Sequence, residues 1–129
     1  MVRLFRVILP VTDIALAARF YGHVLQEAGE RVSGGRHYFR GEGGAILACY
    51  DPVADGDTLG EGWRHHPNQY AYFSADDLPA VRARVIAAGG QGVTGIRSMP
   101  WGETLFYALD PFANPISFVK AGTEFTGSD

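Results

Sequence analysis

The sequence predicts an α+β fold built from two similar halves. In each half an apolar strand runs into an acidic residue and an amphipathic helix follows at once, first over Val7–Leu25 and again over Tyr70–Gly90. Further short strands, separated by Gly-rich or Asp-Pro turns, follow each helix. One such unit cannot bury its sheet face alone, whereas two copies side by side can. We therefore expect a single domain over residues 1–129, with module one at about 1–50, a linker at about 51–68, module two at about 69–122 and a loose tail at 123–129.

The first strand and helix are the clearest elements of the first half. Phe5–Val11 is bulky or β-branched and has no helical period, which predicts a strand, and Pro10 fits a strand end or an edge because it lacks an N–H donor. Thr12 or Asp13 is a suitable N-cap for the next helix, which Gly29 stops. The helix carries one apolar stripe, formed by Ile14, Ala17, Ala18, Tyr21, Val24 and Leu25.

The rest of the first half predicts a hairpin and a long loop. Glu30–Val32 begins a short extended piece, and Arg36–Arg40 and Ala45–Tyr50 are strands joined by a turn at Gly41–Gly44. Asp51–Asn68 is rich in Asp, Gly and Pro and has no hydrophobic period. We interpret it as a solvated acidic loop between the halves, of a length that often borders a site.

The second half repeats this order. Asp76–Asp77 supplies the cap of its helix, Pro79 lies in the first helical turn, where a missing N–H costs little, and Gly89–Gly90 ends the helix. Asp110–Asn114 has turn chemistry. The predicted strands are Gln69–Ala75, Gln91–Ser98, Thr104–Leu109 and Pro115–Lys120.

Composition excludes several classes of function. A formal charge of −3 gives no electrostatic footprint for nucleic acid or for an anionic membrane. No apolar run approaches the roughly 20 residues that a membrane span requires, and no secretory signal is expected. The single Cys49 excludes an internal disulfide and a multi-cysteine metal site, and no phosphate-binding glycine loop is found. These features predict a cytoplasmic protein.

Several short motifs recur in a characteristic order along the chain. They are Val11–Thr12–Asp13 before the first helix, Phe20–Tyr21 within it, Asp77–Leu78, Pro100–Trp101–Gly102, and Asp110–Pro111 with Asn114 before the last strand. Together they resemble the vicinal oxygen chelate superfamily, which includes glyoxalases, extradiol dioxygenases and bleomycin resistance proteins. The resemblance covers roughly residues 5 to 120 and implies two βαβββ modules whose mixed sheets curl around a central cavity, often completed by a dimer partner.

The resemblance also implies where a metal would bind. Enzymes of this superfamily hold a divalent ion through His, Gln or Glu at inward-facing strand positions, and the corresponding residues here are Arg6, Leu47, Tyr70 and Ser117. None of these is a good ligand for a hard or borderline cation. We therefore predict no metal and no cofactor. An unconventional site formed by His37, His65 or His66 stays open.

Polar and aromatic residues at the cavity positions are the candidate ligand contacts. Arg6 could bind a carboxylate, phosphate or carbonyl group, or could form a structural ion pair with a residue such as Glu103. Tyr70 and Tyr72 share one strand face and could stack on a planar ligand, or could pack in a core or dimer contact.

The remaining candidates have equally open alternatives. Trp101, in a Gly-flanked loop, suits a cleft wall or a subunit interface. Cys49 shares inward parity with Leu47 and is expected to be inert, because no base or cation that would activate it is evident. The predicted ligand-binding set is Arg6, Leu47, Cys49, Tyr70, Tyr72, Trp101 and Ser117, and no catalytic residue is assigned.

Two functions from different classes follow from the resemblance. The first is a metal-free binding protein resembling bleomycin resistance proteins, which holds a small molecule in the cavity of a homodimer. The alternative is a metal-dependent, glyoxalase- or dioxygenase-like lyase or oxidoreductase. A partner-binding subunit with a filled cavity is a third option.

Overall fold

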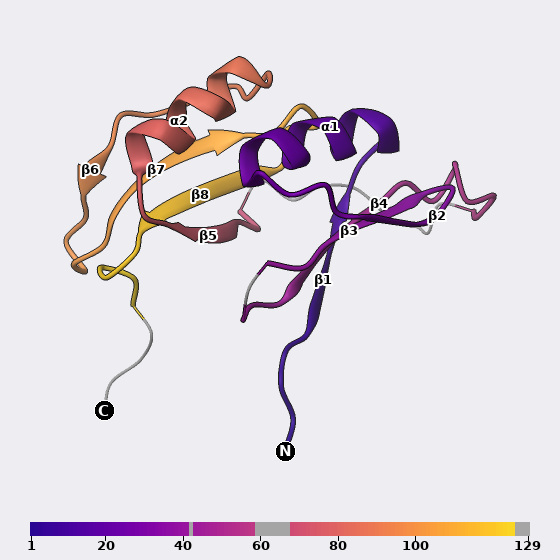
Figure 1. Ribbon diagram of the computed structural model, residues 1–129, viewed down its shortest axis with the longest axis horizontal. Coiled ribbons are helices and arrows are strands. Elements are labelled where there is room, and N and C mark those ends of the chain that lie inside the picture. Colours follow the sequence, from indigo (N-terminus) through magenta and orange to yellow (C-terminus); the bar gives the residue numbers. More distant parts are fainter. Residues whose placement is uncertain (42, 59–67, 126–129) are drawn as a thin grey trace. The chain divides into compact units, whose positions relative to one another are not determined.

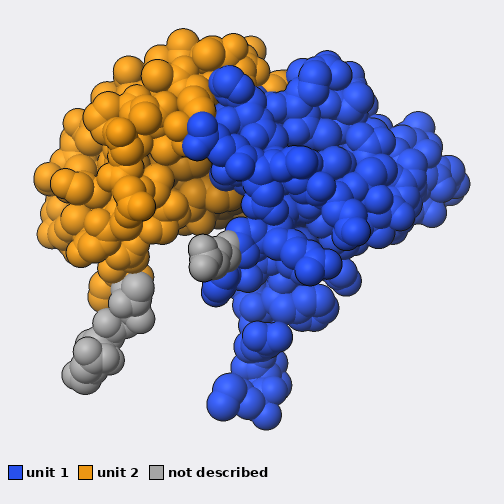
Figure 2. All heavy atoms as spheres, viewed as in Figure 1, with its two compact units in different colours: residues 1–66 blue, residues 67–129 orange. Residues whose placement is uncertain are grey.

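The computed structural model describes residues 1–41, 43–58 and 68–125, and the chain divides into two compact units, residues 1–66 and 67–129 (Figure 1, Figure 2). This division falls inside the predicted linker. His65 and His66 lie outside the described residues. The two units are described one at a time below.

The described residues of unit 1 form one helix and one four-stranded mixed sheet. The sheet order is β1-β4-β3-β2, with β1 parallel to β4 and the other pairs antiparallel. Its elements are β1 (Arg6–Pro10), α1 (Ile14–Leu25), β2 (Glu30–Ser33), β3 (Arg36–Phe39) and β4 (Ile46–Tyr50).

Unit 2 repeats this topology. The sheet order is β5-β8-β7-β6, with β5 parallel to β8, and α2 contacts β7 and β8 (Figure 1). Its elements are β5 (Ala71–Ala75), α2 (Leu78–Ala87), β6 (Arg97–Ser98), β7 (Thr104–Leu109) and β8 (Pro115–Lys120). The predicted α+β class with two modules of one topology is confirmed.

Both helices begin at the predicted acidic caps. The side chain of Asp13 accepts a hydrogen bond from the Leu16 N–H at 3.0 Å, and Asp77 accepts from the Ala80 N–H at 3.1 Å. Each bond satisfies one of the backbone donors that a helix start leaves unpaired. Gln26 ends α1 in the left-handed conformation, with φ of 54°.

The predicted strand over Gln91–Ser98 is mostly irregular. Only Arg97–Ser98 forms a strand, while Gln91 makes an isolated bridge to Leu109. Gly92 has a φ of 56°, which breaks the extended conformation between the two paired pieces. The segment therefore follows β7 without forming a continuous ladder.

The described start of the acidic loop, residues 51–58, is packed against the turn between β2 and β3. The Asp55 carboxylate accepts from Ser33 Oγ at 2.7 Å and from the Gly35 N–H at 2.6 Å, and it forms an ion pair with Arg36. Asp51 is buried as well. The interpretation of this run as a solvated loop is wrong for Asp51 and Asp55, because the β2–β3 turn provides partners that sequence spacing does not show.

Aromatic rings fill the buried face of each sheet. In unit 1 the Phe39 ring on β3 lies 6.2 Å from Tyr21 of α1. In unit 2 Phe73, Phe118 and Phe106 form one row across β5, β8 and β7, with successive ring centroids 5.1 and 5.2 Å apart. Phe106 and Phe118 are almost fully buried, which identifies this as the face covered by α2.

Candidate functional site: an aromatic pocket in unit 2

The opposite face of the unit 2 sheet carries a row of hydroxyl side chains. Tyr72 on β5 pairs with Ser117 on β8, which pairs with Tyr107 on β7. Successive residues of a strand point to opposite faces, so this row lies back to back with the phenylalanine row. Tyr70 precedes β5, and its ring lies 6.1 Å from that of Tyr72 and 5.5 Å from that of Tyr107.

Three tyrosine rings therefore form one cluster on the face away from α2. The prediction that Tyr70 and Tyr72 share a face is confirmed. Tyr107 was missed, although the turn at Asp110–Asn114 pairs Leu109 with Pro115 and so fixes Tyr107 opposite Ser117. Reading the hairpin register outward from that turn would have found it.

The environment of Tyr72 favours its neutral form. Although about half of Tyr72 is exposed, its partial desolvation, followed by a hydrogen bond with Tyr107 and the nearby Glu103 carboxylate, raises the pKa of Tyr72 to about 12. A neutral phenol keeps its O–H donor over the whole physiological range, so it can hydrogen-bond a ligand without carrying charge.

We expect the Tyr72 phenol to ionise well above the ordinary range of tyrosine in an alkaline titration. Because its pKa is raised above the ordinary 10, its contribution to stability is present below about pH 10 and is lost as the pH rises toward 12. Ultraviolet difference titration of Tyr72→Phe should show one tyrosine fewer in the high-pH step near pH 12 than the wild-type protein does. An unchanged high-pH step in the variant would contradict the assignment.

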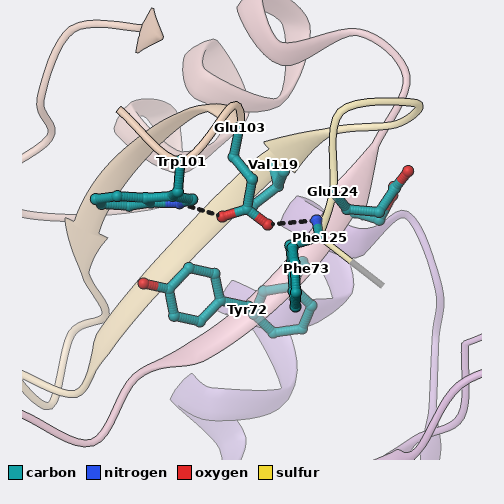
Figure 3. A pocket seen from close by; sticks show the side chains of 8 residues that line it. Tyr72, Phe73, Trp101, Glu103, Val119, Glu124 and Phe125 are labelled. Carbon is teal, nitrogen blue, oxygen red and sulfur yellow. Dashed lines mark hydrogen bonds between the residues drawn. The ribbon is translucent and has the colours of Figure 1, made fainter. Parts of the chain in front are cut away.

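An open pocket of about 570 Å³ lies beside Tyr72 (Figure 3). The hairpin between β6 and β7 supplies part of its wall: Met99 N–H donates to Glu103 O at 2.8 Å, Gly102 adopts a φ of 99°, and Trp101 stands at the tip. The lining residues are Tyr72, Phe73, Ser74, Trp101, Glu103, Val119, Glu124 and Phe125.

One carboxylate connects two walls of this pocket. Glu103 Oε1 accepts from the indole Nε1–H of Trp101 at 2.7 Å, and Glu103 Oε2 accepts from the backbone N–H of Phe125 at 2.8 Å (Figure 3). Sequence reasoning considered Glu103 only as an ion-pair partner for Arg6 and overlooked Phe125. Residues 123–129 were expected to form a loose tail, but in the part that the structure describes Thr123–Phe125 is hydrogen-bonded to the rest of unit 2.

Of the predicted contacts Trp101 and Ser117, the first is exposed in the pocket and the second is buried in the sheet. Trp101 lines the pocket with about half of its surface exposed, at 53%. Ser117 lies in the tyrosine row but is fully buried, and its Oγ donates to the Phe106 carbonyl at 3.1 Å. Its hydroxyl proton is therefore already used within the sheet.

The candidates in unit 1 do not share one face. Arg6 is exposed and its guanidinium lies 5.1 Å from the Phe5 ring and 5.4 Å from the Tyr38 ring. Leu47 pairs with Val7, and Cys49 pairs with Leu9, so both lie on the opposite face from Arg6. Both are buried.

The predicted correspondence between Leu47 and Ser117 is wrong by one residue. Ser117 pairs with Tyr72 across β8 and β5, and the matching pair in unit 1 is Ala48 with Ile8. A shift of one residue moves every side chain of a strand to the other face. Leu47 and Cys49 therefore belong to the layer that contains Phe39, on the side of α1.

The side chains at the metal positions of the superfamily do not fit a metal ion. Arg6 carries a permanent positive charge, and Ala48 has no donor atom. Tyr70 offers only a phenol that packs against Tyr72 and Tyr107, and the Ser117 hydroxyl is already bonded. Within residues 1–41, 43–58 and 68–125 no three His, Cys, Asp or Glu side chains are grouped so as to hold a metal ion.

His37 is already bonded through both ring nitrogens. Its Nε2 lies 2.9 Å from the Ala28 carbonyl, and its Nδ1 accepts from Arg31 Nε at 3.2 Å. Both contacts together select the tautomer with hydrogen on Nε2. His65 and His66, the other members of the unconventional site, lie outside the described residues.

No helix in the described part of the chain has the length and apolar character needed to cross a membrane.

Comparison with known proteins identifies related folds. A family model described as the Glyoxalase/Bleomycin resistance protein/Dioxygenase superfamily matches residues 3–118. A search of curated proteins found no match.

Solved structures of similar fold come from several bacteria. A glyoxalase/bleomycin resistance protein from Albidiferax ferrireducens T118 has a TM-score of 0.73 at 20% identity, covering 91% of this chain and 98% of the other. A glyoxalase-related enzyme from Fulvimarina pelagi has a TM-score of 0.76 at 19% identity, covering 100% and 95%. TnmS3, an antibiotic binding protein from Streptomyces sp. CB03234, has a TM-score of 0.65 at 22% identity, covering 93% and 96%.

Proposed function

Since the chain belongs to the glyoxalase/bleomycin resistance protein/dioxygenase superfamily, we propose that it is a metal-free protein that binds a small molecule and acts as a homodimer. The observation that carries this proposal is the pocket of unit 2, in which aromatic rings are exposed around a few polar groups. Binding sites for small molecules have this composition: apolar and aromatic walls with a small number of polar anchors.

The exposed rings are the strongest part of the case. Tyr72 and Trp101 are each 53% exposed and Phe125 is 73% exposed, although all three line one hollow. Large apolar groups that gather on a surface mark a place where another molecule binds. Tyr72 and Tyr107 add phenol donors beside these rings, and the lining set contains no basic side chain.

The similarity to TnmS3, which is an antibiotic binding protein, supports a binding role. The similarity to a glyoxalase-related enzyme keeps the enzymatic alternative in view, as a metal-dependent lyase or oxidoreductase. That chemistry requires a set of metal ligands. The residues at the corresponding positions do not provide one, so we favour binding; they are Arg6, Ala48, Tyr70 and Ser117.

The proposal is tested with purified protein by thermal shift against a panel of small planar aromatic compounds, together with native mass spectrometry and metal analysis. We expect at least one aromatic compound to raise Tm in the wild-type protein and to have a much smaller effect on Trp101→Ala. Ile86→Ala, which removes a similarly exposed apolar side chain from α2, is the control and should respond as the wild type does.

Two results would contradict the proposal. One is a stoichiometric Ni, Zn, Fe or Mn that is lost with Arg6→Ala or Ser117→Ala. The other is a ligand response that is unchanged in Trp101→Ala. The homodimer is tested separately by light scattering at micromolar concentration, where a monomer mass would refute it.

A further inference from the structure

The chain folds back on itself directly after β8. Thr123 N–H donates to the Lys120 carbonyl at 3.0 Å, and Gly122 adopts a φ of 93° in the turn. The Thr123 hydroxyl donates to the same carbonyl at 2.7 Å and accepts from the Thr104 N–H at 3.2 Å. The turn is therefore tied to both strands of the β7–β8 hairpin.

Glu124 continues this anchoring. Its Oε2 accepts from Ser74 Oγ at 2.6 Å, and its Oε1 accepts from the Gly122 N–H at 2.7 Å. These bonds, with that from Ser74 the stronger cause, lower the pKa of the Glu124 carboxyl. The carboxylate is the form that holds the segment against β5 at neutral pH.

Phe125 is the last described residue and is held by its backbone. Its N–H donates to Glu103 Oε2, while the other oxygen of the same carboxylate accepts from Trp101 (Figure 3). The Phe125 ring is 73% exposed, so apolar burial within the chain does not explain its position. Hydrogen bonds to a charged acceptor do, because they are stronger than neutral ones.

The two carboxylates of the pocket thus have a role in holding its walls. Each one accepts two hydrogen bonds from within unit 2. What they leave open to a ligand is the set of rings, namely those of Tyr72, Trp101 and Phe125. Rings of this kind bind a flat aromatic molecule by stacking and edge contacts.

We propose that Glu103 is a positioning residue that holds Gly122–Phe125 against the β6–β7 hairpin, and that Phe125 contacts the ligand together with Trp101. This inference rests on the proposed binding function and adds the ligand class, a flat aromatic molecule without a negative charge. An anion is disfavoured because Glu103 and Glu124 both line the pocket. Arg97 shares this sheet face through its pairing with Leu105, but it is not among the lining residues.

Binding of pyrene, a flat neutral aromatic fluorophore, tests the role of Phe125. We expect Phe125→Ala to lower the affinity for the probe at least about tenfold, which is the scale of a well-placed aromatic contact. Ile86→Ala should leave the affinity unchanged. An anionic analogue that carries a sulfonate should bind the wild-type protein more weakly than the neutral probe.

The role of Glu103 is tested by a double-mutant cycle and by amide hydrogen exchange. Glu103→Gln should weaken binding of the probe. The double variant Glu103→Gln, Phe125→Ala should lose less binding free energy than the two single variants lose together, because both residues act on one wall. The Phe125 amide should exchange faster in Glu103→Gln than in the wild type. Asp76→Asn removes the same charge from an exposed residue of unit 2 and should change neither quantity.

The outcomes separate this inference from the function on which it rests. If the wild type binds the probe and Phe125→Ala binds it equally well, the inference fails and the binding function stands. Additive losses, or an unchanged Phe125 amide in Glu103→Gln, would refute the positioning role. If neither the neutral nor the anionic probe binds the wild type, both the ligand class and the proposed use of this pocket are wrong.

Discussion

Asp110→Ala is expected to lower the free energy of unfolding by about 3–5 kcal/mol, the cost of leaving several buried donors without an acceptor. Asp110 is fully buried in the turn between β7 and β8. Its Oδ1 accepts from the Phe112 N–H at 2.8 Å and from the Asn114 N–H at 2.9 Å, and its Oδ2 accepts from Asn114 Nδ2 at 3.0 Å. Alanine removes all three acceptor contacts at once.

Urea unfolding measures this loss, and two variants bracket it. Asp110→Asn keeps one side-chain oxygen as an acceptor and should lose less than Asp110→Ala. Asp76→Ala removes an exposed carboxylate and should change the stability by less than about 0.5 kcal/mol. A loss below about 1 kcal/mol for Asp110→Ala would show that water or a rearranged turn replaces the carboxylate.

The turn built on Asp110 explains why the fold could be predicted from the sequence. A turn in which Pro111 follows Asp110 and Asn114 comes four residues after Asp110 has few conformations open to it. The strands on either side were predicted with the bounds observed. The acidic caps Asp13 and Asp77 fixed the helix starts for the same reason. Local chemistry determines these features, so spacing along the chain is sufficient to find them.

The face of each strand residue was harder to predict. Tyr70 and Tyr72 lie two apart on one extended segment, so their common face followed from alternation alone. To predict the face of Leu47, the strand pairing of one half had to be compared with that of the other, and the two halves share little sequence. An error of one residue in that comparison placed Leu47 on the wrong face. Register between strands depends on contacts that the order of residues does not contain.

Phe125 shows a different limit. Residues 123–129 are small or polar apart from one ring, and such a composition indicates a loose terminus. Thr123–Phe125 is nevertheless held, because Glu103 and Ser74 lie where the backbone of Phe125 and the side chain of Glu124 can bond to them. Long-range hydrogen bonds of this kind leave no periodic signal in the sequence.

Gly35→Ala is expected to cost at least about 3 kcal/mol, at or beyond the upper end of the usual penalty for adding a carbon atom to a packed interior. Gly35 is buried in the turn between β2 and β3. A Cβ atom there would overlap the Asp51 backbone oxygen and lie 3.0 Å from the Asp55 backbone nitrogen. Both are backbone atoms, so rotation of a side chain cannot relieve the overlap.

The close approach of Gly35 to Asp51 and Asp55 also holds the start of the acidic loop in place through two hydrogen bonds. Gly35 N–H donates to the Asp55 carboxylate, and the Gly35 carbonyl accepts from the Asp51 N–H at 2.7 Å. Relief of the clash must therefore move the loop away and weaken both bonds, together with the ion pair between Arg36 and Asp55. Chemical denaturation should show the loss of stability. In the variant, the amides of Asp51 and of residue 35 should exchange faster than they do in the wild type.

Gly44→Ala is the matched control, since its added Cβ would meet no atom within 4 Å. Alanine there should change the stability by less than about 0.5 kcal/mol, or raise it slightly by restricting the unfolded chain. Equal losses in the two variants would mean that the glycine-to-alanine change itself, and not the approach of Asp51, is responsible. A loss confined to Gly35→Ala would establish that the loop is part of the folded structure of unit 1, as its hydrogen bonds to Ser33 and Gly35 require.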